Sequence, residues 1–221
     1  MLKKLYKYRF EIFLSTQLAI LFGSLFFPKD FFEYVLLPFL YLISIAAGIL
    51  MISKRKKLMW FFIGLFSIAA FIFGFSMISR SHNEGNILLR LSIYFVFHIT
   101  VTWNIIQQVW KAKRVNRNVI IGLMSGYISL GFLAFFLFMS IELLAPGSYT
   151  GPLLETNNFE VRSESILYYA YITLLTIGYG EIVPVTPIAQ KAAILVGLIG
   201  QFYMVIITAV VIEKYIKHSA K

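Results

Sequence analysis

Five consecutive residues place two glycines at alternate positions along the chain: Thr176, Ile177, Gly178, Tyr179 and Gly180. In an ordinary strand successive peptide groups point in opposite directions. If alternate residues take left-handed dihedrals, which glycine does at little cost, successive carbonyl oxygens can face one axis. A row of such oxygens can replace the water shell of a dehydrated cation. The spacing of the two glycines therefore fits a strand that presents its carbonyl oxygens to one axis. The Thr176 hydroxyl would add an oxygen at its inner end, and the side chains of Ile177 and Tyr179 would turn away and pack against the preceding helix.

The pentad TIGYG resembles the selectivity-filter sequence of potassium channels, usually written T-V/I-G-Y-G. The resemblance implies that K⁺ is the permeant ligand, bound at the carbonyl oxygens of residues 176–180 and at Thr176, with no other cofactor. It also implies that an aromatic pair and a threonine in the pore helix, and an acid after the filter, support the filter: Tyr168, Tyr169, Thr173 and Glu181. In relatives the second aromatic residue and the acid form a hydrogen-bonded cuff, a role that falls here on Tyr169 and Glu181.

The resemblance covers residues 119–212. Gly200 stands at the position of the hinge glycine in the family's inner helix, and Gly197 could act as the hinge as well. Both glycines are equally well explained as small residues that let helices pack closely. Leu175 replaces a common second threonine, and Ile172 is apolar where some relatives have a buried glutamate. Both departures concern filter gating. Because the chain holds one filter and a ring of carbonyls needs four copies, we expect a homotetramer.

The segment before the pentad, residues 163–175, is apolar and aromatic but short. As a helix it would reach about 20 Å, which is too little to cross a membrane. Ser163 is a suitable N-cap, and Glu164 suits the positive end of the helix dipole. A short apolar helix between two longer apolar runs predicts a re-entrant segment, whose non-helical backbone is tolerated where it is buried in protein or lines a watery cavity.

The composition predicts a membrane protein around these residues. Hydrophobic residues make up 59% of the 221 residues and charged residues only 14%, against roughly 45–50% and ~25% in soluble domains. The absence of cysteine excludes disulfides and thiolate metal sites. We expect an all-α membrane protein with six transmembrane helices and a re-entrant pore helix and filter loop between spans five and six. The predicted spans are residues 10–27, 34–52, 58–78, 87–110, 119–144 and 188–212.

The charges alternate between the two sides of these spans. Most of the 20 Lys and Arg residues lie on one side, near Lys3, Lys54, Lys111 and Lys214, whereas most of the 10 acids lie on the other. The positive-inside rule then places both termini in the cytoplasm of a multi-pass protein of the cell (inner) membrane. The partners expected are further copies of the chain and membrane lipids. The same distribution explains the net charge of +10 without nucleic acid.

The six-span pattern invites comparison with voltage-gated channels, whose fourth span carries an arginine at every third position. Here the fourth span has Arg90 alone, and steep gating uses roughly 3–4 charges per subunit. We therefore expect residues 1–118 to form a four-helix bundle resembling a voltage-sensor framework without gating arginines, and residues 119–221 to form the pore domain. His98 lies within the fourth span and fits interhelical hydrogen bonding, with a proton-sensing role as the alternative.

Two other transport functions remain compatible with the sequence: a non-selective cation channel and a subunit of a potassium transporter. Tyr179 argues against the first, because non-selective relatives carry an acid at that position. A single filter unit argues against the second, because such transporters repeat the unit four times in one chain. An enzyme is not expected, since the three histidines are scattered and no P-loop or HExxH pattern occurs. The sequence does not indicate a gating stimulus.

Overall fold

A computed structural model describes residues 6, 8–28, 31–52, 56–79, 84–112, 116–156 and 158–219 of the chain. The chain forms two compact units, Met1–Gly126 and Tyr127–Lys221. The sequence predicted a boundary between residues 118 and 119, whereas the first unit extends into the following helix. Packing explains the difference, because a side chain added at Gly122 would lie 3.0 Å from the Phe10 ring, which belongs to the first unit.

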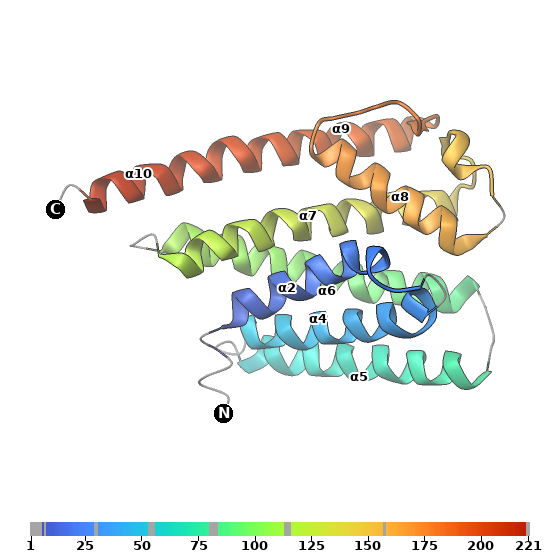
Figure 1. The fold of residues 1–221 in the computed structure, drawn as a ribbon, viewed down its shortest axis with the longest axis horizontal. Coiled ribbons are helices and arrows are strands. Elements are labelled where there is room, and N and C mark those ends of the chain that lie inside the picture. Colours follow the sequence, from blue (N-terminus) through green and yellow to red (C-terminus); the bar gives the residue numbers. More distant parts are fainter. Residues whose placement is uncertain are drawn as a thin grey trace. The chain divides into compact units, whose positions relative to one another are not determined.

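The first unit is a bundle of helices that run side by side (Figure 1). Its elements are α2 (Arg9–Phe22), the 3₁₀ turn η1 (Gly23–Leu25), the π-helical turn η2 (Phe32–Leu36), α4 (Leu37–Ile52), α5 (Lys56–Ser79) and α6 (Glu84–Lys111). Helix α4 packs against α2, α5 and α6. Aromatic rings fill the core: Phe62 and Phe97 meet edge to face with ring centroids 5.6 Å apart, and Tyr41 stacks on Tyr94 at 4.7 Å.

The first helix is shorter than the first predicted span, residues 10–27. Helix α2 ends at Phe22, and the amides of Phe26 and Phe27 both bond to the Gly23 carbonyl at 3.0 and 3.3 Å. Pro28 follows, and the residue before a proline is pushed away from helical dihedrals. The chain therefore tightens into η1 instead of continuing as α-helix, and α2 has a length of only about 21 Å.

Polar side chains are buried within the first unit. His98 is 1% exposed, and its ring meets Phe97 edge to face at 5.2 Å. An interhelical hydrogen bond joins α6 to α2 at Gln108, whose Oε1 accepts from Arg9 Nη2 at 3.1 Å. Asn104 differs, because its Nδ2 donates to the carbonyl of Thr100 in its own helix at 2.7 Å. Helix α6 thus contacts the first residue of α2 through a polar side chain near its end.

The second unit contains most of α7 (Arg117–Leu144) and everything after it. Its further elements are the strand β1 (Tyr149–Thr150), the 3₁₀ turn η3 (Pro152–Leu154), α8 (Phe159–Leu174), the strand β2 (Val183–Pro184), α9 (Pro187–Phe202), the π-helical turn η4 (Tyr203–Ile207) and α10 (Thr208–Ser219). Helix α8 lies beside α9 (Figure 1). It is also held to α7, because the Tyr171 hydroxyl donates to the Ile128 carbonyl at 2.7 Å.

Two helices among the described residues are long and apolar enough to cross a membrane. They are Arg117–Leu144, with a mean hydropathy of 2.1, and Pro187–Ile216, with a mean hydropathy of 2.4. Shorter apolar stretches, Phe39–Leu50 and Met59–Ile68, lie in α4 and α5. Helices thus occur at each of the six predicted ranges, and two of them meet the length and hydropathy of a span.

The start of α8 differs from the prediction. The helix begins at Phe159, so Ser163 lies in its second turn and is not the N-cap. Asn158 caps the helix instead, because its Oδ1 accepts from the Val161 amide at 3.4 Å and asparagine is a strong N-cap residue. With 16 residues, α8 still reaches only about 24 Å. Helix α9 begins at Pro187, and the Thr186 hydroxyl caps it by accepting from the Ala189 amide.

Candidate ion-binding site

The five residues 176–180, here called the filter segment, follow directly on the last turn of α8. The chain leaves the helix through hydrogen bonds to helical carbonyls: the Thr176 amide donates to Thr173 at 3.0 Å, and the Ile177 amide donates to Ile172 at 2.9 Å. These bonds tie the inner end of the filter segment to α8. The negative end of the α8 dipole therefore lies beside the place where the segment begins, an arrangement that favours a cation.

The backbone of the filter segment alternates in handedness. Gly178 has φ 60° and Gly180 has φ 94°, which confirms the left-handed conformation predicted for both glycines. Thr176 also has a positive φ, 57°, which the sequence did not predict because a β-branched residue in this region is an outlier. Positive φ at residues 176, 178 and 180 is the alternation that turns successive carbonyl oxygens to one side of a strand.

The side chains of the filter segment correct one prediction. Ile177 and Tyr179 were expected to pack against the preceding helix, yet within one chain they are 47% and 71% exposed. Leu175, just before the segment, is 45% exposed. Within one chain, α8 therefore leaves a large part of these apolar side chains uncovered.

The residues predicted to support the filter are brought together, but with different partners. The hydroxyl of Tyr168, not that of Tyr169, donates a hydrogen bond to Glu181 Oε1. Tyr169 is 5% exposed and packs its ring against Phe138 and Tyr149, with centroids 5.1 and 5.4 Å away. The reason is helical geometry: adjacent residues point about 100° apart around a helix, so only one of the two tyrosines can face Glu181.

A cavity of about 300 Å³ lies between α8 and the filter segment. Its lining combines residues of α8, backbone of the filter segment and residues that follow it: Tyr169, Ile172, Thr173, Thr176, Gly178, Gly180, Ile182, Val183 and Pro184. Thr173, a predicted support residue, therefore borders the filter segment. Ile172 makes this lining apolar where some potassium channels have a buried acid. Groups of three or more His, Asp or Glu side chains that could hold a metal ion do not occur among the described residues.

The segment that leaves the filter is fixed by a two-stranded sheet. Strand β1 pairs with β2 in antiparallel fashion, with Tyr149 opposite Pro184 and Thr150 opposite Val183. Gly151 follows β1 and lies so close to the Glu181 carbonyl that a Cβ would collide with it. This sheet was not predicted, since two-residue strands leave no periodic pattern in the sequence.

The two glycines proposed as a gating hinge have different surroundings. Gly200 lies against the Leu174 carbonyl at the end of α8, where any Cβ would collide. That carbonyl also accepts from the Tyr127 hydroxyl at 3.3 Å. Gly197 is freer, because its nearest neighbour, the Thr173 carbonyl, is 4.0 Å from a built Cβ. The close contact between Gly200 and the end of α8 indicates that Gly200 has a packing role. The helix first departs from α-helical geometry further along the chain, in the π-helical turn η4.

Comparison with known protein families found a match that lies within the second unit. Residues 127–217 match the profile of a protein family described as "Ion channel". The match begins where the second unit begins and ends within α10, so it includes the filter segment. Searches of curated proteins and of solved structures found no match. The family match and the two long apolar helices support an ion-channel family and a membrane location for this protein.

Proposed function

We propose that the protein is a potassium-selective channel that conducts K⁺ passively through a tetrameric pore. The observation that carries the proposal is the positive φ of Thr176, Gly178 and Gly180 within a TIGYG pentad. Carbonyl oxygens presented at every residue give a dehydrated K⁺ a succession of sites. Conduction requires several sites of moderate strength rather than one tight site, and a five-residue strand supplies them.

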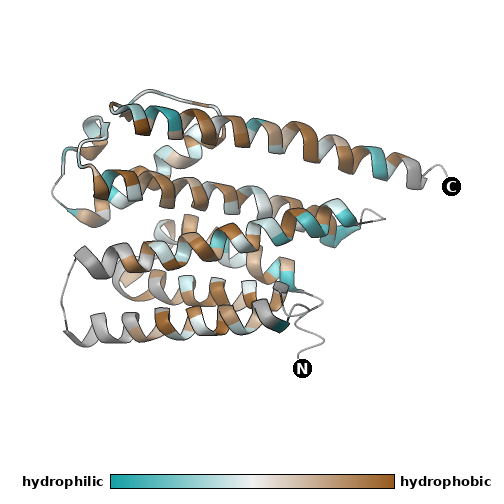
Figure 2. Cartoon of the chain, turned by 180° about the vertical axis from the view of Figure 1, so that it is seen from behind, coloured by the Kyte–Doolittle hydropathy of each residue, from teal (hydrophilic) through white to brown (hydrophobic). Residues whose placement is uncertain are grey.

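Four copies of the chain are needed to close each ring of oxygens, and the surfaces of the second unit support that assembly. In the most apolar window of Pro187–Ile216 only 22% of residues are buried, against 61% for Arg117–Leu144. Hydrophobic residues nevertheless run along most of the helical stretch that ends at the C mark (Figure 2). Together with the exposed Ile177 and Tyr179, this face has the composition of a contact between copies.

The inner end of the filter would receive ions from the cytoplasmic side. The Thr176 hydroxyl adds an oxygen there, and the carbonyl end of α8 supplies a negative potential that favours a cation entering the segment. Lys and Arg residues gather on the same side of the predicted spans, which agrees with cytoplasmic termini in a cell membrane. In this arrangement the Tyr168–Glu181 pair lies at the outer mouth.

The first unit is proposed to be a framework with weak or no voltage dependence. Helix α6 has Arg90 as its only arginine, and the positions at three-residue steps after it are Ile93, Val96, Ile99 and Thr102. One charge moved through 100 mV is worth about 2.3 kcal/mol, well below what 3–4 charges per subunit supply. Steep activation of purified channels by depolarisation would contradict this part of the proposal.

Reversal potentials of the purified protein in planar bilayers test the proposal against its alternatives. With both ions on both sides and opposing K⁺ and Na⁺ gradients, the current should reverse close to the potassium equilibrium potential. A reversal potential near zero would indicate a non-selective cation channel. A transporter would show no single-channel currents. Its potassium uptake into vesicles would require a second ion gradient or another subunit. Gly178→Ala provides the matched negative variant, because an L-residue resists φ 60°.

A further inference from the structure

The carbonyl group at the end of α8 needs a hydrogen-bond donor from another element. Leu174 is the last residue of α8 and is 1% exposed. The last carbonyls of a helix have no amide partner within the helix, and a buried carbonyl without a donor is unfavourable. The backbone of Gly200 closes off one side of the Leu174 carbonyl. The donor therefore has to approach from a different direction.

That donor is Tyr127 of α7. Its hydroxyl donates to the Leu174 carbonyl at 3.3 Å. Its ring packs against the ring of Tyr203, with centroids 5.5 Å apart. Tyr203 is the first residue of the π-helical turn η4 and is 5% exposed. The inner helix thus fixes the Tyr127 ring from one side, and the end of α8 takes its hydroxyl on the other.

The Gly178 amide is the alternative donor for the Leu174 carbonyl. An amide four residues further along is the donor that continues an α-helix, but the Gly178 amide lies 3.4 Å from the Ile172 carbonyl instead. If it bonded to Leu174, residues 175–177 would need right-handed helical dihedrals. Thr176 would then lose its φ of 57°, and its carbonyl would no longer face the same side as the others.

The strain at Thr176 favours this helical alternative. A positive φ is costly for a β-branched residue, and such a conformation persists only where the surrounding structure imposes it. The Tyr127 hydroxyl opposes the change, because it occupies the Leu174 carbonyl that an extended α8 would use. A side chain of α7 thus acts on the backbone two residues before the filter segment.

We infer that Tyr127 is a positioning residue that keeps the inner end of the filter segment in its ion-binding conformation. The inference rests on the proposed function. The hydroxyl does not touch the ion; it holds the Leu174 carbonyl. Without it, the innermost ion site, which includes the Thr176 hydroxyl, is formed for a smaller fraction of the time. The apparent affinity for K⁺ falls with that fraction, whereas saturating K⁺ restores the conformation that binds it.

The chain offers a matched control for this hydrogen bond. The Tyr171 hydroxyl of α8 donates to the Ile128 carbonyl of α7 at 2.7 Å. This bond joins the same two helices, but its acceptor belongs to α7 and not to the turn that leads into the filter segment. Tyr171→Phe therefore removes one hydrogen bond between α7 and α8, as Tyr127→Phe does, without releasing the Leu174 carbonyl.

The test measures single-channel conductance of purified tetramers in planar bilayers as internal K⁺ is varied and external K⁺ is held constant. Tyr127→Phe should raise the half-saturating internal K⁺ concentration about threefold to tenfold, as the loss of one hydrogen bond predicts. The maximal conductance should stay at the value of the parent channel. Tyr171→Phe should keep both values.

A second pair of variants decides the matter if Tyr127→Phe does not assemble. Tyr203→Leu removes the ring that orients Tyr127, so it should raise the half-saturating internal K⁺ concentration by a smaller factor. Phe132→Leu is its control, because Phe132 is fully buried and its ring meets that of Tyr171, with centroids 6.0 Å apart. It should keep the half-saturating concentration of the parent channel.

The outcomes separate this inference from the proposed function. If the parent channel conducts K⁺ selectively and each variant has the half-saturating concentration of its control, Tyr127 does not position the filter and the inference is wrong. Equal increases in Tyr127→Phe and Tyr171→Phe would also refute it, because they would reflect loosened packing between α7 and α8. A lower maximal conductance with unchanged half-saturation would be a third refutation. If the parent channel carries no K⁺ current, the proposed function itself fails, and the inference fails with it.

Discussion

Gly200 of α9 lies directly against the carbonyl oxygen of Leu174, the last residue of α8. This contact joins the inner helix to the residue after which the chain turns into the filter segment. It leaves no space for a side chain, whereas Gly197, one turn earlier, has such space. Gly197 and Gly200, which the sequence alone does not distinguish, therefore differ in the space around them.

Gly200→Ala should destabilise the folded second unit. The new methyl group would force α9 away from α8, and overpacking of this kind costs about 1–3 kcal/mol. Gly197→Ala should be neutral or stabilising by up to about 1 kcal/mol, because alanine favours the helix. Thermal unfolding of the two variants in detergent measures the difference. Equal melting temperatures, with Gly200→Ala changing only the open probability, would instead favour a hinge at Gly200.

Gly178→Ala should abolish K⁺ selectivity without preventing assembly. An L-residue at φ 60° costs about 1–2 kcal/mol, and the chain can relieve this strain by turning the carbonyl away. The permeability ratio of K⁺ to Na⁺, obtained from reversal potentials, is the measurement. Gly64→Ala is the matched control, since a methyl group there meets nothing within 4 Å. Selectivity that survives in Gly178→Ala would show that the left-handed backbone is not required.

Tyr168→Phe should speed the decay of the current, because it removes the hydrogen bond that links α8 to Glu181 just after the filter segment. A bond to a charged acceptor that is partly exposed predicts a change of about threefold to tenfold in the rate of current decay. Glu181→Gln should have a smaller effect, since the amide oxygen still accepts from the Tyr168 hydroxyl. Macroscopic currents from reconstituted channels provide the rates. The opposite order of the two variants would exclude this hydrogen bond as the support.

Tyr149→Phe should leave conduction unchanged and raise stability slightly. The Tyr149 hydroxyl is buried, and no hydrogen-bond partner for it exists in the described part of the chain. Its removal relieves a desolvation cost of about 1 kcal/mol, while the backbone bond to Glu142 and the packing on Tyr169 remain. Denaturant or thermal unfolding at neutral pH measures the gain. A loss of more than about 1 kcal/mol would show that the hydroxyl has a partner.

The difference in stability between the parent protein and Tyr149→Phe should depend on alkaline pH. Burial, with the nearby Tyr169 and Glu142 adding to it, raises the pKa of Tyr149 above its ordinary value of about 10. Above that pH the unfolded chain releases the proton while the folded chain keeps it. The contribution of Tyr149 to stability is therefore complete below about pH 10 and declines as the pH rises further. The stability advantage of Tyr149→Phe should grow above pH 10, and an advantage that shrinks would contradict this assignment.

The sequence predicts the positions of α4, α5, α6 and α7 well because each coincides with a long apolar run. It predicts Gly178 and Gly180 as left-handed because glycine alone adopts that conformation freely. The left-handed Thr176 was not predictable from residue type, because the bonds from the filter segment to Thr173 and Ile172 impose it. The early start of α8 depends on the cap by Asn158, which competes with Ser163 as an equally good capping residue.

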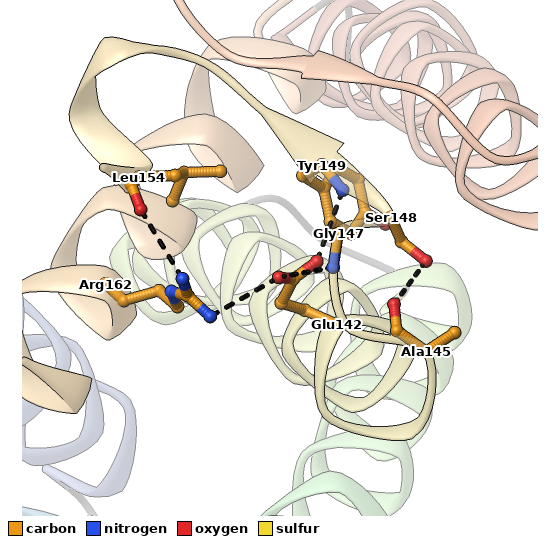
Figure 3. A network of polar contacts seen from close by, with 7 residues as sticks. All are labelled: Glu142, Ala145, Gly147, Ser148, Tyr149, Leu154 and Arg162. Atoms are coloured by element: carbon orange, nitrogen blue, oxygen red, sulfur yellow. Dashed lines mark hydrogen bonds and ion pairs between the residues drawn. The ribbon is translucent and has the colours of Figure 1, made fainter. Parts of the chain in front are cut away.

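Two features of the site depend on tertiary contacts that the sequence hides. The choice of Tyr168 over Tyr169 as partner of Glu181 follows from the rotation of α8, which Phe138 and Tyr149 set by packing on Tyr169. The contacts of the Glu142 carboxylate with the Gly147 and Tyr149 amides and with Arg162 (Figure 3) were not predicted, although Glu142 left a signal in the sequence. Glu142 is an acid within the last turn of an apolar run, and such residues are functional candidates. Its partners were not identifiable, because two of them are backbone amides.

Anomalous diffraction from crystals of the tetramer grown in Rb⁺ tests the central claim most directly, because Rb⁺ can replace K⁺ and its position is measured independently of the protein. The account predicts a row of ion peaks on the fourfold axis, each enclosed by carbonyl oxygens of residues 176–180, with the innermost peak beside the Thr176 hydroxyl. Peaks located elsewhere, or a filter segment that lies away from the symmetry axis, would contradict it.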